Sequence, residues 1–397
     1  MATKDAAPTV GNWATLALIV LIALNLRPFL TAPGPILAMI RADTGLANGA
    51  VAMLTLLPML LMGLGAFVSP AVQSVIVTRR GVLLALAVLA LGSALRSIVP
   101  NGMTLSLTAE LCGAGVAFLQ AVVPGIIKAE FPRATAPVTG DYSAIIMGGG
   151  AAGAWIAPKL VEAGYNWRIA LAAMGLPTLL AMMTAAAVLP NARHSRKDLT
   201  LMRQLLRRPR TWALMFAFGL VNGGYASLVT WLAPYYQSKG WSATSSGSLV
   251  AAMAIAQAVA ALSVPFLARR NIDRRPWLLA TLLMQGAGFT GLAFFPLVAP
   301  FVWVIVCGAG LAASFALVIV TALDHLSSAE QAGALAALMQ GGGFLIAAFA
   351  PYEMARLIEW CGGYTAGWIM HLIFLFTTFG LYLRFDPKRY EEVMNIT

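Results

Sequence analysis

The chain has 397 residues, of which 60% are hydrophobic and only 10% are charged, and its mean hydropathy is +0.81. Soluble globular domains do not have this composition. The net charge of +11 could indicate nucleic-acid binding, but apolar segments of about 20 residues recur from end to end and leave no room for a soluble domain. We therefore expect a protein that lies in the lipid bilayer and does not bind nucleic acid.

Hydropathy windows of about 19 residues predict twelve membrane-spanning helices. In chain order they cover residues 14–40, 50–76, 81–99, 104–127, 139–162, 168–189, 211–236, 243–268, 276–296, 299–323, 332–357 and 365–383. The first span contains Arg27 and lacks a small-residue cleavage site, so we expect it to be retained. The three cysteines have no CxxC spacing, and they predict neither a disulfide nor a metal site. No cofactor is expected.

One long polar connector, residues 191–210, separates the two halves of the chain. It carries seven basic side chains against the single carboxylate of Asp198. If the amino terminus is cytoplasmic, 19 of the 26 basic residues fall on the cytoplasmic side, and the positive-inside rule then places both termini there. We expect a multi-pass protein of the bacterial inner membrane, with a six-helix bundle at 1–190, a basic cytoplasmic linker at 191–210, and a second six-helix bundle with a short tail at 211–397.

An internal repeat relates the two halves. Cys112–Gly115 in the fourth span recurs as Cys307–Gly310 in the tenth, and Gly148–Gly150 in the fifth span recurs as Gly341–Gly343 in the eleventh. Chance clustering of glycine explains one such match but explains ordered matches poorly. Parallel six-helix repeats flanking a central solute site are the arrangement of major facilitator transporters. The sequence therefore predicts an all-α membrane protein of twelve helices in two pseudo-symmetric six-helix bundles.

The glycines of the fifth span, Gly148–Gly153, formally satisfy the GxGxxG pattern of dinucleotide-binding folds. No strand precedes them, and no acidic residue follows at about 20 positions to bind a ribose, so the context excludes that interpretation. Small residues at this spacing let membrane helices approach each other closely. We expect the fifth and eleventh helices to use them in this way.

Arg27 is the clearest functional candidate, because a charged side chain at the bilayer centre costs about 2.5–3.5 kcal/mol even on insertion scales. At about 1.5 Å per residue it lies near the midplane. Pro28, Pro33 and Pro35 follow, which predicts a bent helix with freed carbonyl groups facing the interior. Arg27 either offers a fork of donors to a small anion or polar planar solute, or is structural and neutralised by a carboxylate or by carbonyl groups. No acidic residue lies at the same depth in neighbouring spans, which favours the first interpretation.

Uncharged polar side chains near the midplane would complete a neutral, donor-rich cavity lined by spans one, four, seven and ten. The candidates are Asn222, Tyr225, Gln257 and Gln340, with Asn25 and Gln120 as weaker members. Lys128 ends the fourth span at the inner face, where it is either an ordinary snorkelling lysine or part of an anion exit path. Asn222 and Asn25 occupy corresponding positions in the two halves. Each of these side chains could instead bond to a neighbouring helix.

Four further ionisable residues lie near the ends of spans. Arg96 and Glu110 should lie at similar depth and could pair across a helix hairpin, which we interpret as a structural contact. Asp324 and His325 end the tenth span and could form a proton relay, a gate latch or simply a polar helix end.

Several strings of residues resemble the cyanate-permease and 2-nitroimidazole-transporter branch of the major facilitator superfamily, over essentially the whole chain and most closely its cyanate permeases. They are Asn25–Thr31, Leu54–Pro58, Gln120–Lys128, Val221–Leu228, Ala322–His325 and Met339–Pro351. The resemblance implies roles for Arg27, Lys128, Asn222 and Gln340 around a small-solute path. After the second span, Arg79 and Arg80 are similar to the tail of the superfamily's Gly-Asp-Arg gating motif.

We therefore expect a monomeric secondary active or facilitative transporter, not an enzyme, that moves a small anion such as cyanate by alternating access. Coupling to protons or to a counter-transported solute stays open. Efflux of nitroimidazole-like or other drug-like compounds is the alternative within the same class. A membrane sensor without transport is a further alternative.

Overall fold

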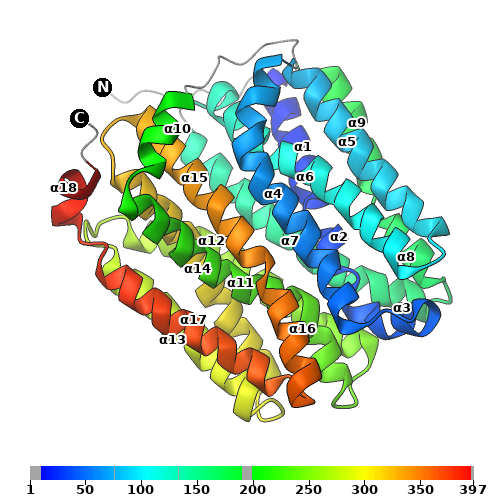
Figure 1. Cartoon of the computed structure of the whole chain (residues 1–397). Helices are drawn as coiled ribbons and strands as arrows, with labels where there is room; N and C mark the ends of the chain where they lie inside the picture. The colour runs from blue at the N-terminus through cyan, green and yellow to red at the C-terminus, as the bar shows by residue number, and fades with distance from the viewer. Residues whose placement is uncertain (1–9, 76, 133, 190–198, 395–397) are drawn as a thin grey trace.

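The computed structural model describes residues 10–75, 77–132, 134–189 and 199–394 of the chain, and every regular element in these ranges is a helix (Figure 1). Twelve of the resulting helical segments are long and apolar enough to cross a membrane. They coincide with the twelve predicted spans, so the predicted fold class is confirmed.

Helices α1 to α9 form the first six spans. The first span is broken into α1 (Val10–Asn25), α2 (Pro28–Thr31), the 3₁₀ turn η1 (Gly34–Ile36) and α3 (Leu37–Thr44). The next four are α4 (Asn48–Val75), α5 (Thr78–Leu95) with η2 (Arg96–Ile98), α6 (Gly102–Glu130) and α7 (Thr135–Glu162). The sixth combines α8 (Trp167–Ala173) and α9 (Leu176–Val188).

Helices α11 to α17 form the second six spans. They are α11 (Pro209–Gln237), α12 (Ala243–Ala268), α13 (Arg275–Phe294), α14 (Pro300–Asp324), α15 (Ala329–Ala348) continued by α16 (Ala350–Cys361), and α17 (Thr365–Leu383). A short helix, α10 (Leu199–Leu206), precedes them, and η3 (Pro387–Arg389) and α18 (Tyr390–Met394) follow. Residues 191–198 of the predicted linker lie outside the described residues, and the proposed boundaries of the two bundles stay a prediction.

The repeated Cys-Gly-Ala-Gly strings perform the same packing task in each half. In α6, Gly113 lies against α4 and Gly115 against α5, and in α14, Gly308 lies against α12 and Gly310 against α13. A Cβ atom at any of these four positions would come under 3.0 Å from the neighbouring helix. Only glycine lets these helices pack so closely, and the shared pattern makes the two halves pseudo-symmetric.

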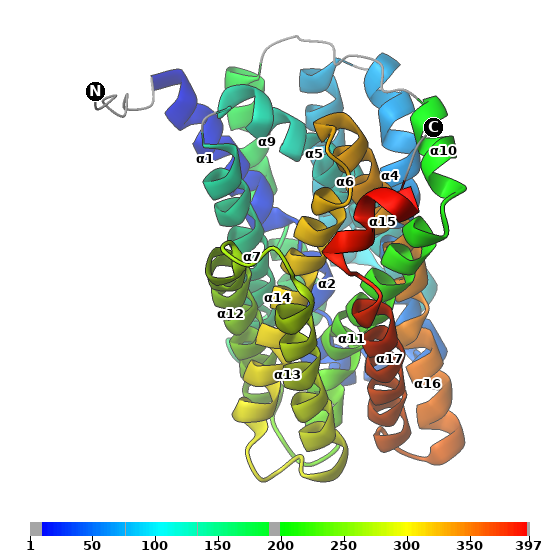
Figure 2. The ribbon, with the colours of Figure 1, turned by 90° about the vertical axis from the view of Figure 1, so that its left-hand side faces the viewer.

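The two halves meet along two pairs of helices. Figure 1 shows α4 beside α15, and Figure 2 shows α7 beside α12. The predicted close approaches of the fifth and eleventh spans are present here, since Gly341 of α15 lies against α4 while Gly342 and Gly343 lie against α11. The start of α1, α10 and α18 mark one end of the molecule, called here the termini end, and α3 marks the opposite or far end (Figure 1).

Near the far end, polar contacts join the two bundles. The Gln237 amide donates a hydrogen bond to the Pro35 carbonyl oxygen at 2.6 Å, and the Thr230 hydroxyl donates to the Thr55 hydroxyl at 2.8 Å. The Thr244 hydroxyl also donates to a carboxylate oxygen of Glu162. These contacts hold the bundles together between the middle of the molecule and its far end.

Candidate functional site

The break in the first span creates the site. Helix α1 stops at Asn25 and α2 starts at Pro28, so that Arg27 lies at the junction. Proline lacks the N–H that would continue the helical ladder, and its ring clashes with the carbonyl four residues earlier. The predicted bend at this position is therefore present. Arg27 is only 4% exposed.

Helix α7 fits around this break by means of its glycines. A Cβ atom at Gly149 would overlap the Leu24 carbonyl group, and one at Gly153 would lie 2.7 Å from the Pro28 Cα. The Thr31 hydroxyl donates a hydrogen bond to the Gly150 carbonyl oxygen at 2.8 Å. The run that formally matched a dinucleotide motif is a surface on which a broken helix packs.

A cavity of about 30 Å³ lies between the two bundles at this depth. Its walls come from the α1–α2 junction and from α7, α11, α12 and α14. The lining residues are Arg27, Ser143, Met147, Val221, Asn222, Tyr225, Gln257, Ala261, Leu311, Ala312 and Phe315. The structure thus brings together four of the side chains selected from the sequence, namely Arg27, Asn222, Tyr225 and Gln257.

The Arg27 guanidinium has no acidic partner among the described residues. Its Cζ atom lies 4.7 Å from the centre of the Tyr225 ring, which is a cation–π contact. No described residue forms an ion pair or a side-chain hydrogen bond with it, and its Nε atom is buried without a partner. Among the described residues, therefore, no buried carboxylate neutralises Arg27 in the way that the structural alternative required.

Two more buried polar atoms near Arg27 lack a hydrogen-bond partner, the hydroxyl oxygen of Tyr142 and Oε1 of Gln257. Gln257 lines the cavity, and Tyr142 lies near enough to Arg27 to feel its charge. Buried polar groups in proteins are nearly always satisfied, so a cluster of three unsatisfied ones indicates a place for a polar ligand or water.

The two repeat-related asparagines have diverged in their contacts. The Asn222 amide donates to the Phe218 carbonyl oxygen at 2.8 Å and lines the cavity. The Asn25 amide makes the equivalent bond to Leu21, but its Oδ1 accepts a 2.8 Å hydrogen bond from Thr178 of α9. Asn25 therefore joins two helices of the first bundle, as the structural alternative proposed.

The expectation that the fourth span lines the cavity is wrong for this structure. Gln120 and Lys128 of α6 and Gln340 of α15 are not among the lining residues, and Lys128 is exposed. The fifth and eighth spans, α7 and α12, line the cavity and run side by side where the bundles meet. Roles for these three residues elsewhere on a solute path stay a prediction. Ser143 and Phe315 also line the cavity, and no signal in the sequence marked them because serine and phenylalanine are ordinary residues of membrane helices.

Arg96 does not pair with Glu110. The Arg96 side chain is 1% exposed and donates a 3.1 Å hydrogen bond to the Phe29 carbonyl oxygen. That carbonyl would bond to the N–H of residue 33 in a continuous helix, but residue 33 is proline and has none. Arg96 thus supplies the donor that Pro33 cannot, and supports the unwound part of the first span.

The remaining predicted residues lie at the termini end. Asp324 forms a 3.2 Å ion pair with Arg274. His325 Nδ1 donates a 2.6 Å hydrogen bond to the Thr321 carbonyl oxygen, and the ring stacks on Tyr390 of the tail at 3.7 Å between centroids. Burial lowers the pKa of His325 to about 4, so the ring is neutral at pH 7 and behaves as a packed helix end.

Arg79 and Arg80, from the predicted gating loop, differ in their surroundings. The Arg79 guanidinium donates to the Ala186 carbonyl oxygen at the end of α9, and Arg80 is exposed. Arg79 therefore ties the start of α5 to α9 within the first bundle.

Comparison with known proteins agrees with this architecture. The chain is 39% identical over 381 residues to the cyanate transport protein CynX of Escherichia coli (strain K12), covering 95% of this chain and 98% of that protein. It is 29% identical over 353 residues to the 2-nitroimidazole transporter of the same organism, covering 88% and 89%.

Solved structures share the fold at low sequence identity. A bacterial homologue of the human lysosomal transporter Spinster, in an inward-facing and unoccupied conformation, has a TM-score of 0.74 at 16% identity and covers 98% of both chains. A D-xylose–proton symporter has a TM-score of 0.75 at 14% identity, covering 93% and 97%. The sequence profile described as Major Facilitator Superfamily matches residues 18–351. The chain is a multi-pass membrane transporter and belongs to the major facilitator superfamily.

Proposed function

We propose that this protein transports a small anion, cyanate or one of similar size, which binds to Arg27 between the two bundles. The observation that carries the proposal is a buried arginine whose charge no described residue neutralises. A buried cation is costly without a partner, and an anionic solute supplies that partner. The 39% identity to a cyanate transport protein supports the same choice.

The shape of the site favours a small, narrow solute. Tyr225 covers a face of the guanidinium, which leaves its in-plane N–H groups for hydrogen bonds to an acceptor. The cavity volume of about 30 Å³ is far below the roughly 300–1,000 Å³ of sites for drug-sized ligands. A triatomic anion such as cyanate is small enough to fit this cavity once the cavity widens modestly.

Transport would proceed by rocking of the two bundles about this cavity. The hydrogen bonds of Gln237 and Thr230 to the first bundle lie on the far side of the cavity, and they close that side in this state. The excess of basic residues at the termini end supports a cytoplasmic location for it and for both termini, in a bacterial inner membrane. We therefore infer that this structure represents the conformation in which the site is open to the cytoplasm.

The described cavity lining contains no carboxylate and no histidine. Facilitated diffusion or exchange of the solute therefore fits this lining better than proton symport, which would need a side chain in the cavity that binds and releases a proton. A pH gradient imposed across proteoliposomes tests this point.

A second candidate is efflux of nitroimidazole-like compounds. It is favoured by the 29% identity to a 2-nitroimidazole transporter and by the aromatic rings of Tyr225 and Phe315 in the lining. Such a solute would depend on ring stacking more than on the charge of Arg27.

Uptake of labelled cyanate and of labelled 2-nitroimidazole into proteoliposomes that contain the purified protein separates the candidates. The proposal expects saturable cyanate uptake that unlabelled cyanate inhibits, with 2-nitroimidazole a weak competitor. Saturable transport of 2-nitroimidazole without transport of cyanate would establish the second candidate. Binding of one of the compounds without transport of either would indicate a sensor.

A further inference from the structure

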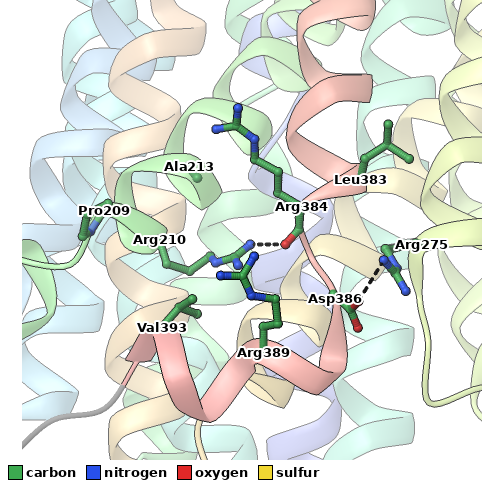
Figure 3. Close-up of a pocket in the computed structure, with 9 residues that line it drawn as sticks. All are labelled: Pro209, Arg210, Ala213, Arg275, Leu383, Arg384, Asp386, Arg389 and Val393. Atoms are coloured by element: carbon green, nitrogen blue, oxygen red, sulfur yellow. Dashed lines mark hydrogen bonds and ion pairs between the residues drawn. The ribbon is translucent and has the colours of Figure 1, made fainter.

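A second cavity lies at the termini end, well away from the central one. Its volume is about 710 Å³, and we call it the tail pocket (Figure 3). It is an open pocket bordered by the starts of α11 and α13, the end of α17 and the tail elements η3 and α18. The lining residues are Pro209, Arg210, Ala213, Arg275, Leu383, Arg384, Asp386, Arg389 and Val393.

The tail pocket carries an excess of positive charge. Among the described lining residues, four are arginines and one, Asp386, is acidic. The Asp386 carboxylate lies 3.3 Å from Nη1 of Arg275, which also pairs with Asp273 at 2.8 Å (Figure 3). The excess of positive charge therefore comes from Arg210, Arg384 and Arg389. Arg389 pairs with Glu392, but both side chains are mostly exposed, and such a pair is weak. Among the described residues, the Arg384 side chain has no hydrogen bond or ion pair.

Arg210 is the buried element of this pocket. It is only 9% exposed, its Nη1 donates to the Arg384 carbonyl oxygen at 2.6 Å, and its Cζ lies 5.4 Å from the Phe385 ring centre. These contacts fix its direction toward the pocket, which Arg389 lines from the tail (Figure 3). Arg384 and Arg389 are near enough to repel Arg210 electrostatically. Guanidinium groups held together in this way are stabilised when an anion binds between them.

One wall of the tail pocket is apolar. Ala213 and Leu383 belong to the ends of two spans, and Leu383 is 48% exposed. The arginines therefore surround a space that begins where the membrane-spanning parts of α11 and α17 end. A ligand that fits both walls has a compact anionic group beside a hydrocarbon segment.

We propose that the tail pocket binds a phosphate group, either the headgroup of an anionic phospholipid or a soluble phosphate. Arginine recognises phosphate by paired N–H donors, and basic pockets between membrane helices are known to hold lipid headgroups. The ligand would join η3 and α18 to the ends of α11 and α17. This site is separate from the central cavity and does not depend on the solute that the protein transports.

The experiment compares full-length variants in two arms. In the first, native mass spectrometry measures the affinity of the purified protein for phosphatidylglycerol relative to phosphatidylcholine. In the second, thermal unfolding in phosphatidylcholine nanodiscs is measured with sodium phosphate against sodium chloride of equal ionic strength. The variants are Arg384→Gln and Arg389→Gln, with Arg270→Gln as the control because Arg270 is an exposed arginine outside the pocket.

The expected result is phosphatidylglycerol binding about fivefold weaker in each pocket variant and unchanged in Arg270→Gln. A thermal shift from phosphate that only the pocket variants lose would assign the site to a soluble anion instead of a lipid. Arg384→Gln removes a side chain without described partners, so a folded variant is expected. The proposal is overturned if neither ligand distinguishes the pocket variants from Arg270→Gln.

Discussion

The guanidinium of Arg27 in the first bundle lies 4.7 Å from the ring centre of Tyr225 in the second, so one cation–π contact crosses between the two bundles at the cavity. Any rocking of one bundle against the other changes this distance. The contact therefore connects the occupancy of the site to the relative position of the bundles.

Tyr225→Ala should weaken uptake by a few-fold to about thirtyfold, since a buried cation–π contact contributes about 0.5–2 kcal/mol. Tyr225→Phe keeps the ring and should stay within about twofold of the unchanged protein. Initial rates of uptake in proteoliposomes at several solute concentrations measure both. Equal losses in the two variants would show that the hydroxyl matters and the ring does not.

Gly149→Ala should destabilise the protein by about 1–3 kcal/mol and reduce uptake, because its Cβ would overlap the Leu24 carbonyl group next to the broken helix. Gly148→Ala is the matched control, since a Cβ at Gly148 meets nothing within 4 Å. Thermal unfolding followed by intrinsic fluorescence compares them. If the two alanine variants unfold at the same temperature, α7 does not pack on the break as described.

Arg96→Met should lower stability by about 1–3 kcal/mol, because the Phe29 carbonyl oxygen would lose its donor while staying buried. Arg96→Lys keeps a donor and should recover part of the loss. Arg270→Gln, at an exposed arginine just after α12, is the control and should unfold like the parent protein. A stable Arg96→Met variant with full activity would mean that Phe29 needs no partner.

Docking of the tail on His325 should weaken as the solution is acidified. The His325 pKa is lowered from 6.5 to about 4 by burial, so below about pH 6.5 the released state takes up a proton that the docked state does not. Docking is therefore fully stable above pH 6.5 and loses at most about 1.4 kcal/mol per pH unit on the way down to about pH 4.

A spin label at Val393 reports this docking through its mobility between pH 7.5 and pH 5. His325→Phe can still stack on Tyr390 and has no proton to bind, so its tail should respond much less to pH. If both proteins release the tail at the same pH, the titrating group is not His325.

The sequence was sufficient to predict the twelve spans, the repeat and four residues of the cavity, because hydropathy and residue spacing give depth along each helix. It could not give the rotation of a helix about its axis. Asn25 and Asn222 have the same depth and the same bond to the preceding turn, yet one joins α1 to α9 and the other lines the cavity.

The contact of Arg96 with Phe29 shows a second limit of the sequence. Glu110 was the expected partner because an arginine and a carboxylate at one depth attract each other. The actual partner is a backbone carbonyl that Pro33 leaves free, four residues after Phe29. That the Phe29 carbonyl lacks a helical donor follows from the position of the prolines. Its contact with Arg96, however, depends on how the broken span lies against α5 and η2.

The most direct test of the central claim is the charge requirement at residue 27. Labelled cyanate uptake is measured in proteoliposomes with Arg27→Gln, with Arg27→Lys, and with Arg41→Gln as an exposed control on the same span. A charged hydrogen-bonding partner contributes about 1.5–3 kcal/mol, so Arg27→Gln should reduce uptake about tenfold to a hundredfold. Arg27→Lys should retain part of the cyanate uptake, and Arg41→Gln should retain all of it. Undiminished saturable uptake by Arg27→Gln would contradict the assignment of Arg27 as the anion-binding residue.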